Sequence, residues 1–156
     1  MTVDHSSPSH PLDPRVRLAA LWTSVMFLVA FVDIFAFYRA DLREQIEAGR
    51  AFVFTINEAF MLGIVLYVAV PSLMVAASVL IPRRVNRLMQ IVVAAVFALT
   101  IIGAAVGERS YYLVASGIEL ALLAGVMAVA VRWKDTPLVA VRDLAATQAT
   151  TRDTRR

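Results

Sequence analysis

Four long apolar runs alternate with short polar segments along this chain. An α-helix of about 20 apolar residues crosses the roughly 30 Å hydrocarbon core of a bilayer, and each run reaches about that length. Short connections place consecutive helices side by side and antiparallel. The predicted fold is therefore all-α, a transmembrane four-helix up-and-down bundle in one domain at residues 18–134. The predicted spans are residues 18–38, 51–81, 88–106 and 111–131.

The second apolar run is longer than a membrane span requires. As one straight helix, residues 51–81 would extend about 45 Å, half as far again as the hydrocarbon core. Pro71 lies inside this run. Proline removes a backbone donor and clashes with the carbonyl one turn earlier, so the sequence predicts a kink between Tyr67 and Pro71.

The polar segments complete the predicted organisation. Residues 39–50 carry charges of both signs, and they predict a short interfacial helix or a helical extension of the first span. Residues 1–17 and 135–156 are poor in large apolar side chains, and both tails are predicted to be disordered.

Composition supports the membrane assignment and excludes several chemistries. The chain is 60% hydrophobic with a mean hydropathy of +0.72, well above a soluble domain. It has no cysteine, which excludes disulfides and thiolate metal sites. The net charge of +3 comes from basic residues that flank the spans, where cations meet anionic lipid headgroups. The lipid bilayer is thus the expected partner, and no nucleic acid is expected.

The distribution of lysine and arginine predicts an orientation. Basic residues near spans are enriched on the cytoplasmic side, and here they predominate on the side that holds both chain ends. Both termini are therefore predicted to be cytoplasmic. The residues on that side are Arg15, Arg17, Arg83, Arg84, Arg87, Arg132 and Lys134, against Arg39, Arg43, Arg50 and Arg109 on the other.

Three carboxylates interrupt the predicted spans, and they are the main functional lead. An acid within hydrocarbon costs about 2 to 3 kcal/mol on insertion scales, so it needs a partner or a role. The predicted topology places all three toward the outer side, with Glu58 the closest to the boundary. One or two helical turns before Glu119, hydroxyl groups share its face. The candidate binding residues are Asp33, Glu58 and Glu119, with Asn57, Tyr112 and Ser116 beside them.

Two interpretations of these acids remain open at the level of sequence. In one, they line an outward-facing site that binds a proton, a cation or a cationic small molecule. In the other, they are salt-bridged to Arg39, Arg50 and Arg109 in a structural or accessory membrane protein. Small residues such as Gly103 and Gly107 would then bind a membrane partner or a second copy.

No catalytic constellation appears in the sequence. No histidine lies in a predicted span, no Gly-rich phosphate loop occurs, and no serine has a base nearby in sequence. A non-enzymatic protein without a cofactor or a metal is expected. The aromatic residues near predicted span ends are expected to form an interfacial belt. They are Trp22, Tyr38, Tyr111, Tyr112 and Trp133.

Short motifs within the spans resemble those of a family of small bacterial four-helix membrane proteins of unknown function. The resemblance covers roughly residues 18–133, and it implies the fold above, a location in the plasma (bacterial inner) membrane, and no known activity. The motifs are Asp33-Ile34-Phe35 with Phe37, Glu58-Ala59-Phe60, Pro71 with Met74, Asn86-Arg87, and Ile118-Glu119.

Overall fold

The computed structural model describes residues 12–51 and 53–133. Four of its helices are long and apolar enough to cross a membrane, which confirms the predicted all-α fold with four candidate spans. A short helix and a two-stranded hairpin lie between the first and second spans. The elements are α1 Pro14–Ala36, α2 Ala40–Glu47, β1 Arg50–Ala51, β2 Phe54–Thr55, α3 Glu58–Leu80, α4 Arg83–Ala105 and α5 Ser110–Arg132.

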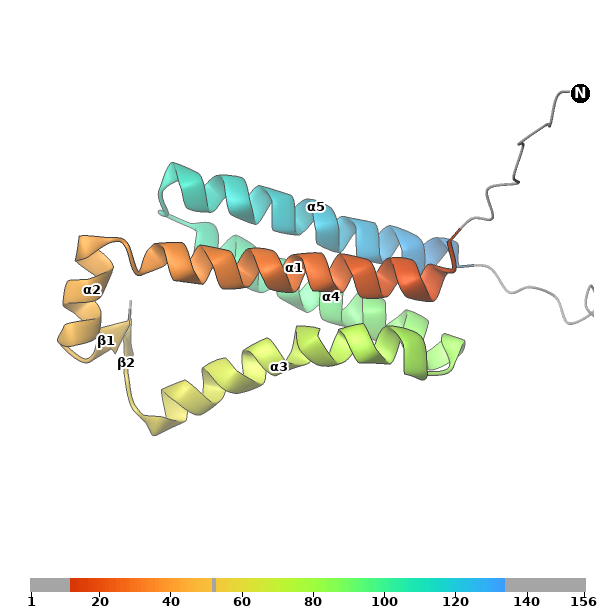
Figure 1. Cartoon of the computed structure of the whole chain (residues 1–156), viewed down its shortest axis with the longest axis horizontal. Helices are drawn as coiled ribbons and strands as arrows, with labels where there is room; N and C mark the ends of the chain where they lie inside the picture. The colour runs from red at the N-terminus through yellow and green to blue at the C-terminus, as the bar shows by residue number, and fades with distance from the viewer. Residues whose placement is uncertain (1–11, 52, 134–156) are drawn as a thin grey trace, which may run out of the picture.

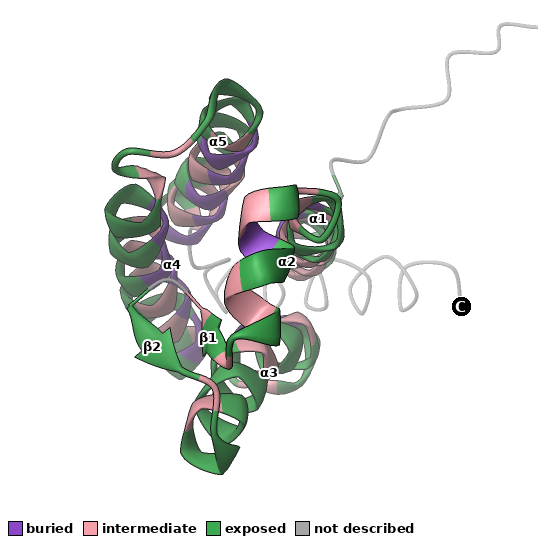
Figure 2. Cartoon of the chain, turned by 90° about the vertical axis from the view of Figure 1, so that its left-hand side faces the viewer, coloured by how far each residue is buried: buried purple, intermediate pink, exposed green. Residues whose placement is uncertain are grey.

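The four long helices run side by side with alternating direction (Figure 1). Helix α1 packs against both α3 and α5, and α5 packs against α4, whereas α3 touches α4 far less. Figure 2 shows the buried faces of these helices turned toward one another. The bundle is therefore least closed between α3 and α4.

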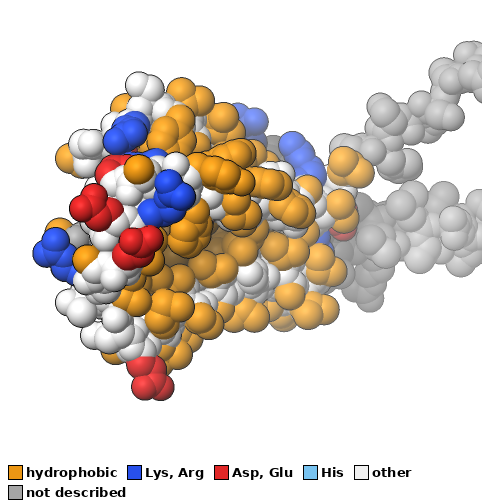
Figure 3. All heavy atoms as spheres, turned by 60° about the vertical axis from the view of Figure 1, so that its left-hand side comes forward, with side chains coloured by type: hydrophobic (Ala, Val, Ile, Leu, Met, Phe, Trp, Pro, Cys, Tyr) orange, Lys and Arg blue, Asp and Glu red, His pale blue; other side chains and the backbone are white. Residues whose placement is uncertain are grey.

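The two ends of the bundle differ in chemistry. We call one the hairpin end, which holds α2, the two strands and the α4–α5 turn at residues 106–109; the tail end is where α1 begins and α5 ends (Figure 1). In the view of Figure 3, charged side chains gather at the hairpin end, and apolar side chains cover the flank of the bundle. An apolar flank with a charged end is the surface expected of a protein that spans a bilayer.

Side-chain caps set where α1 and α3 begin. The Asp13 carboxylate accepts a hydrogen bond from the Arg15 backbone N–H at 2.8 Å, so α1 starts at Pro14. Residues 14–17, assigned to the disordered tail from the sequence, are therefore helical. Residues 1–11 and 135–156 of the predicted tails lie outside the described residues.

The second span is shorter than the predicted 51–81. Asn57 Oδ1 accepts a hydrogen bond from the Phe60 N–H at 2.9 Å, and this cap starts α3 at Glu58. Before it, β1 and β2 pair antiparallel, with Arg50 opposite Thr55. Gly49, at φ 71°, supplies the left-handed turn into β1. The apolar residues before Asn57 thus belong to the hairpin rather than to the span.

Helix α3 changes direction near its middle (Figure 1), in agreement with the predicted kink at Pro71. Its residues before Pro71 include none that is buried, whereas Met74, Ala77 and Ser78 after it are buried. Proline lacks the N–H that would bond to the Tyr67 carbonyl, and this allows the helix to bend. The start of α3 therefore stands away from α1 and α5 (Figure 1).

A polar network lies at the centre of the tail half of the bundle, and its four side chains, Trp22, Ser78, Asn86 and Gln90, are fully buried. Gln90 Oε1 accepts from Trp22 Nε1. Gln90 Nε2 donates to Ser78 Oγ and to Asn86 Oδ1, both at 2.9 Å. Asn86 Nδ2 donates to the carbonyls of Ala77 and Ser78 at 3.1 and 2.9 Å. Every donor has a partner, so this network joins α1, α3 and α4.

The prediction that Trp22 belongs to an interfacial belt is wrong. Its side chain is 0% exposed, and its ring meets Phe97 edge-on with centroids 6.1 Å apart. Trp133, in contrast, is half-buried at the end of α5, where its carbonyl and its ring both meet Arg83. One tryptophan is thus a core residue, and the other closes the tail end of the bundle.

Candidate acidic site

Glu119 lies in the middle of the buried face of α5. Its side chain is 5% exposed, and Leu123 and Val126 on the same face are fully buried. One turn earlier Ser116 is 4% exposed, and one further turn earlier Tyr112 is half-buried. Helical spacing puts these three polar side chains on one interior-facing stripe, as the sequence predicts.

Asp33 comes from α1, the helix that packs against α5. It follows the buried Val32 and lies one turn before the end of its helix, where it is exposed. Asp33 and Glu119 interact electrostatically with each other, and each also interacts electrostatically with Tyr112. Asp33, Tyr112 and Glu119 therefore interact electrostatically between α1 and α5, and Ser116 lies on the same face of α5 as Glu119.

Tyr67 extends this polar region to α3 and α4, and sequence analysis missed it. Its hydroxyl lies 2.8 Å from Thr100 Oγ1, and its ring stacks on Phe97 with centroids 4.7 Å apart. Thr100 Oγ1 also donates to the Phe97 carbonyl at 2.8 Å, so Tyr67 is the donor to Thr100. Tyr67 lies within electrostatic range of Tyr112. A tyrosine one turn before a proline in mid-span was the available signal.

Asn57 and Glu58 do not join the other candidates. Asn57 caps α3 with its side-chain oxygen, which is a structural role. Glu58 is the exposed first residue of α3, at the end that stands away from α1 and α5 (Figure 1). A carboxylate in the first turn of a helix is favourable there because it faces the positive end of the helix dipole. The structure thus separates Glu58 from Asp33 and Glu119.

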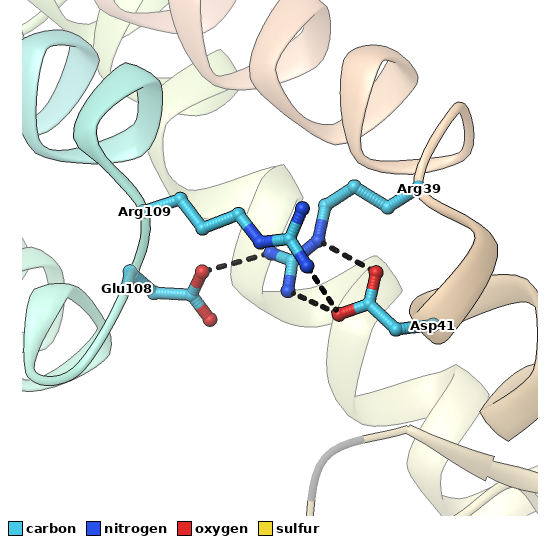
Figure 4. A network of polar contacts seen from close by, with 4 residues as sticks. All are labelled: Arg39, Asp41, Glu108 and Arg109. Atoms are coloured by element: carbon cyan, nitrogen blue, oxygen red, sulfur yellow. Dashed lines mark hydrogen bonds and ion pairs between the residues drawn. The ribbon is translucent and has the colours of Figure 1, made fainter.

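Two arginines of the hairpin end, Arg39 and Arg109, pair with one acid in α2 and one in the α4–α5 turn (Figure 4). Arg39 Nη2 lies 2.8 Å from Asp41 Oδ2, and Arg39 Nη1 lies 2.8 Å from Glu108 Oε2. Arg109 Nη2 approaches Asp41 Oδ2 at 3.4 Å. We call Arg39, Asp41, Glu108 and Arg109 the arginine clamp. It ties the α1–α2 junction to the α4–α5 turn.

Among the described residues, the arginines of the clamp do not pair with the intramembrane acids. Within residues 12–51 and 53–133, no ion pair is formed by Asp33, Glu58 or Glu119. Arg39 and Arg109, expected as partners in the salt-bridged interpretation, are instead bound to Asp41 and Glu108. Nor do the described residues include a group of three or more acidic or histidine side chains suited to a metal ion.

The clamp shifts the titration of its members. The hydrogen bond from Arg39 lowers the pKa of Asp41 from 3.8 to about 2, and the bond to Asp41, with that to Tyr111, raises the pKa of Arg39. Arg39 is charged at all ordinary pH values, so Asp41 is the member that titrates. Because the pKa of Asp41 is lower in the folded state, its contribution to stability is complete above about pH 4 and is lost toward pH 2.

Acid should therefore weaken the clamp within a defined window. We expect the unfolding temperature in detergent to fall between pH 4 and pH 2. It should fall less in Asp41→Asn, because the amide at position 41 is not protonated in this pH range. Circular dichroism against temperature measures both. Glu47→Gln, an exposed position on the same helix, serves as the control. An identical acid response in Asp41→Asn and the parent would contradict this role of Asp41.

Comparison with known protein families assigns the chain to one of them. A family model matches residues 13–140, which include all four candidate spans, the acidic site and the arginine clamp. The chain belongs to DUF6326, a family of unknown function. This agrees with the family of unknown function that its motifs resemble. No curated protein and no solved structure matches the chain. Membership of DUF6326 therefore brings no activity with it, and the site must be interpreted from its own chemistry.

Proposed function

We propose that this DUF6326 member is a non-enzymatic integral membrane protein that binds a proton, a cation or a cationic small molecule at Glu119 and Asp33. One observation carries the proposal. Glu119 is 5% exposed, lies on the interior face of a candidate span, and forms no ion pair within the described residues. An ionisable residue in such a place is a functional-site hypothesis by default.

The second carboxylate strengthens the argument for a cationic ligand. Asp33 adds its charge to that of Glu119 because the two lie within electrostatic range. Like charges in a poorly solvated region repel, and a bound proton or cation relieves that repulsion. Tyr112 and Ser116 offer hydroxyl oxygens on the same face of α5. The chemistry of these groups suits a positively charged ligand and no anion.

The proposed setting follows from charge placement. With the arginine-rich tail end facing the cytoplasm, both termini are cytoplasmic and the hairpin end faces outward. Asp33 lies near the end of α1 on that side, so in the proposed orientation the site is nearer the outer surface of the membrane than the cytoplasmic one. We place the protein in the plasma membrane of a bacterium, the setting that its motif resemblance implies.

Titration with a cationic probe tests the site. We expect tetraphenylphosphonium to bind the full chain in detergent, and Glu119→Gln to weaken that binding at least about tenfold by removing the interior charge. Isothermal titration calorimetry measures the affinity. Proton release in weakly buffered solution shows whether the probe displaces a proton. Glu58→Gln is the matched control because Glu58 is exposed and distant from the site.

Equal affinities in the parent, Glu119→Gln and Glu58→Gln would contradict the proposal. A second class of function would then gain support, in which the protein binds a membrane partner or a second copy of itself. A specific observation favours that alternative: side chains added at Gly103 or Gly117 would meet nothing within 4 Å. These small residues are not used for packing within the described chain, so a close helix–helix contact is available to another molecule.

A further inference from the structure

A groove of about 540 Å³ lies between α1 and α5 at the tail end, away from the acidic site. On the α1 side it is lined by Arg17, Ala20, Leu21 and Ser24. These positions follow helical spacing, so they lie on one face of α1. Arg17 is at the tail end of this face, and the other three residues continue it toward the middle of the bundle. The Ser24 hydroxyl donates a hydrogen bond to the Ala20 carbonyl at 3.0 Å, so its donor already has a partner within α1.

Helix α5 supplies the same pattern in reverse. Its lining residues are Arg132, Val129, Ala128 and Gly125, at the same intervals counted from the bundle end. Because α1 and α5 are antiparallel neighbours, Arg17 and Arg132 both line the groove toward the tail end, and smaller residues line it deeper in the bundle. The Leu21 side chain packs over Gly125, since a Cβ added there would lie 3.5 Å from Leu21 Cδ2.

The two groove arginines differ from others at this end. Arg15 donates to the Val79 carbonyl at 3.0 Å, and Arg83 donates to the Trp133 carbonyl. Arg17 and Arg132 are exposed, and within the described residues they take part in no hydrogen bond or ion pair of their side chains. The guanidinium groups of Arg17 and Arg132 can therefore bind an anion at the tail end of the groove, which the predicted topology places at the membrane surface.

We propose that this groove binds one phospholipid with an anionic headgroup. The phosphodiester accepts hydrogen bonds from the guanidinium groups of Arg17 and Arg132, and an acyl chain lies along Ala20 and Ala128. Basic pockets between transmembrane helices on the cytoplasmic side hold anionic headgroups for this reason. Charge complementarity at the arginines and the mostly apolar lining beyond them favour a lipid over a free anion. The inference is independent of the acidic site.

Native mass spectrometry of the full chain in detergent tests the groove, with dioleoylphosphatidylglycerol as the probe. We expect one lipid per chain, and binding roughly tenfold weaker or more for dioleoylphosphatidylcholine, which has the same chains but no net charge. The double variant Arg17→Gln/Arg132→Gln should weaken phosphatidylglycerol binding by roughly ten- to thirtyfold. Thermal unfolding checks that each variant is folded.

Two further variants separate the groove from surface charge in general. Arg84→Gln/Arg87→Gln removes two exposed arginines from the same end but outside the groove, and should retain binding. Ala128→Leu keeps both groove arginines but fills the channel, and should weaken binding. Inorganic phosphate at the lipid concentration should not compete, because it lacks the acyl chain.

Several outcomes would overturn the inference. Equal binding of phosphatidylcholine would show that charge is irrelevant. Equal losses in the two double-arginine variants would indicate a diffuse basic surface. Displacement by inorganic phosphate would indicate a site for a free anion. Unchanged binding in Ala128→Leu would mean that the acyl chain does not lie in the groove. A dimer without bound lipid would make the groove an interface between copies of the chain.

Discussion

Replacing Trp22 with alanine should lower the free energy of unfolding by about 3 to 5 kcal/mol. Trp22 is fully buried, its ring meets Phe97 edge-on, and its indole N–H donates to Gln90. Alanine leaves a large cavity and deprives the Gln90 carbonyl oxygen of its donor. Reversible unfolding in mixed micelles, followed by circular dichroism, gives the difference.

A double-mutant cycle divides this loss between packing and hydrogen bonding. Trp22→Phe keeps most of the ring but removes the N–H, and should cost about 1 to 2 kcal/mol, within the range for interhelical bonds in membranes. Combined with Gln90→Leu, the cost should be less than the sum of the single changes. Phe27→Ala, at a side chain that is 62% exposed on the same helix, is the control and should cost far less. Additive effects would mean that the Trp22–Gln90 bond does not stabilise the fold.

The second large effect is a gain in stability. Glu119→Leu should raise the free energy of unfolding by about 2 to 3 kcal/mol, the insertion cost of an acid within hydrocarbon. Glu119 has no ion-pair partner within the described residues to lose, and leucine has a similar volume and suits its neighbours Leu123 and Val126. The same variant should fail to bind tetraphenylphosphonium. Unfolding in micelles and calorimetry on one preparation measure both properties.

Glu58→Leu provides the matched comparison because Glu58 is exposed at the start of α3. There the acid favours the helix N-terminus, so its loss should leave stability unchanged or slightly reduced. If Glu119→Leu were instead destabilising, Glu119 would have a structural role, as the salt-bridged interpretation requires. A stabilised variant without ligand binding is the pattern expected of a residue kept for function.

The span assignments were predictable because hydropathy depends on sequence alone. Helix α3 shows the limit of that signal: the apolar residues before Asn57 read as part of the span, yet they form the β1–β2 hairpin. Hydropathy does not distinguish an apolar strand from an apolar helix over a few residues. The misplaced start carried Glu58 into the predicted site. The capping asparagine was the local feature that marked the true boundary.

Partners across helices were not predictable in the same way. The placement of Glu119 with Tyr112 and Ser116 followed from spacing within one helix. Trp22 and Gln90 are 68 residues apart in sequence, and their bond depends on how α1 and α4 face each other. For the same reason, the pairing of Arg39 with Glu108 could not be distinguished from a pairing with an intramembrane acid.

The bend at Pro71 divides α3 into an anchored arm and a free arm. The anchored arm is fixed through Ser78, which accepts from Gln90, whereas the free arm from Glu58 to Val70 has no buried residue. The two arms of α3 therefore differ in how firmly they are packed into the bundle. Tyr67, one turn before Pro71, contacts α4 in two ways: its hydroxyl lies 2.8 Å from Thr100 Oγ1, and its ring stacks on Phe97. Tyr67 therefore connects the arm of α3 that has no buried residue to α4, within electrostatic range of Tyr112.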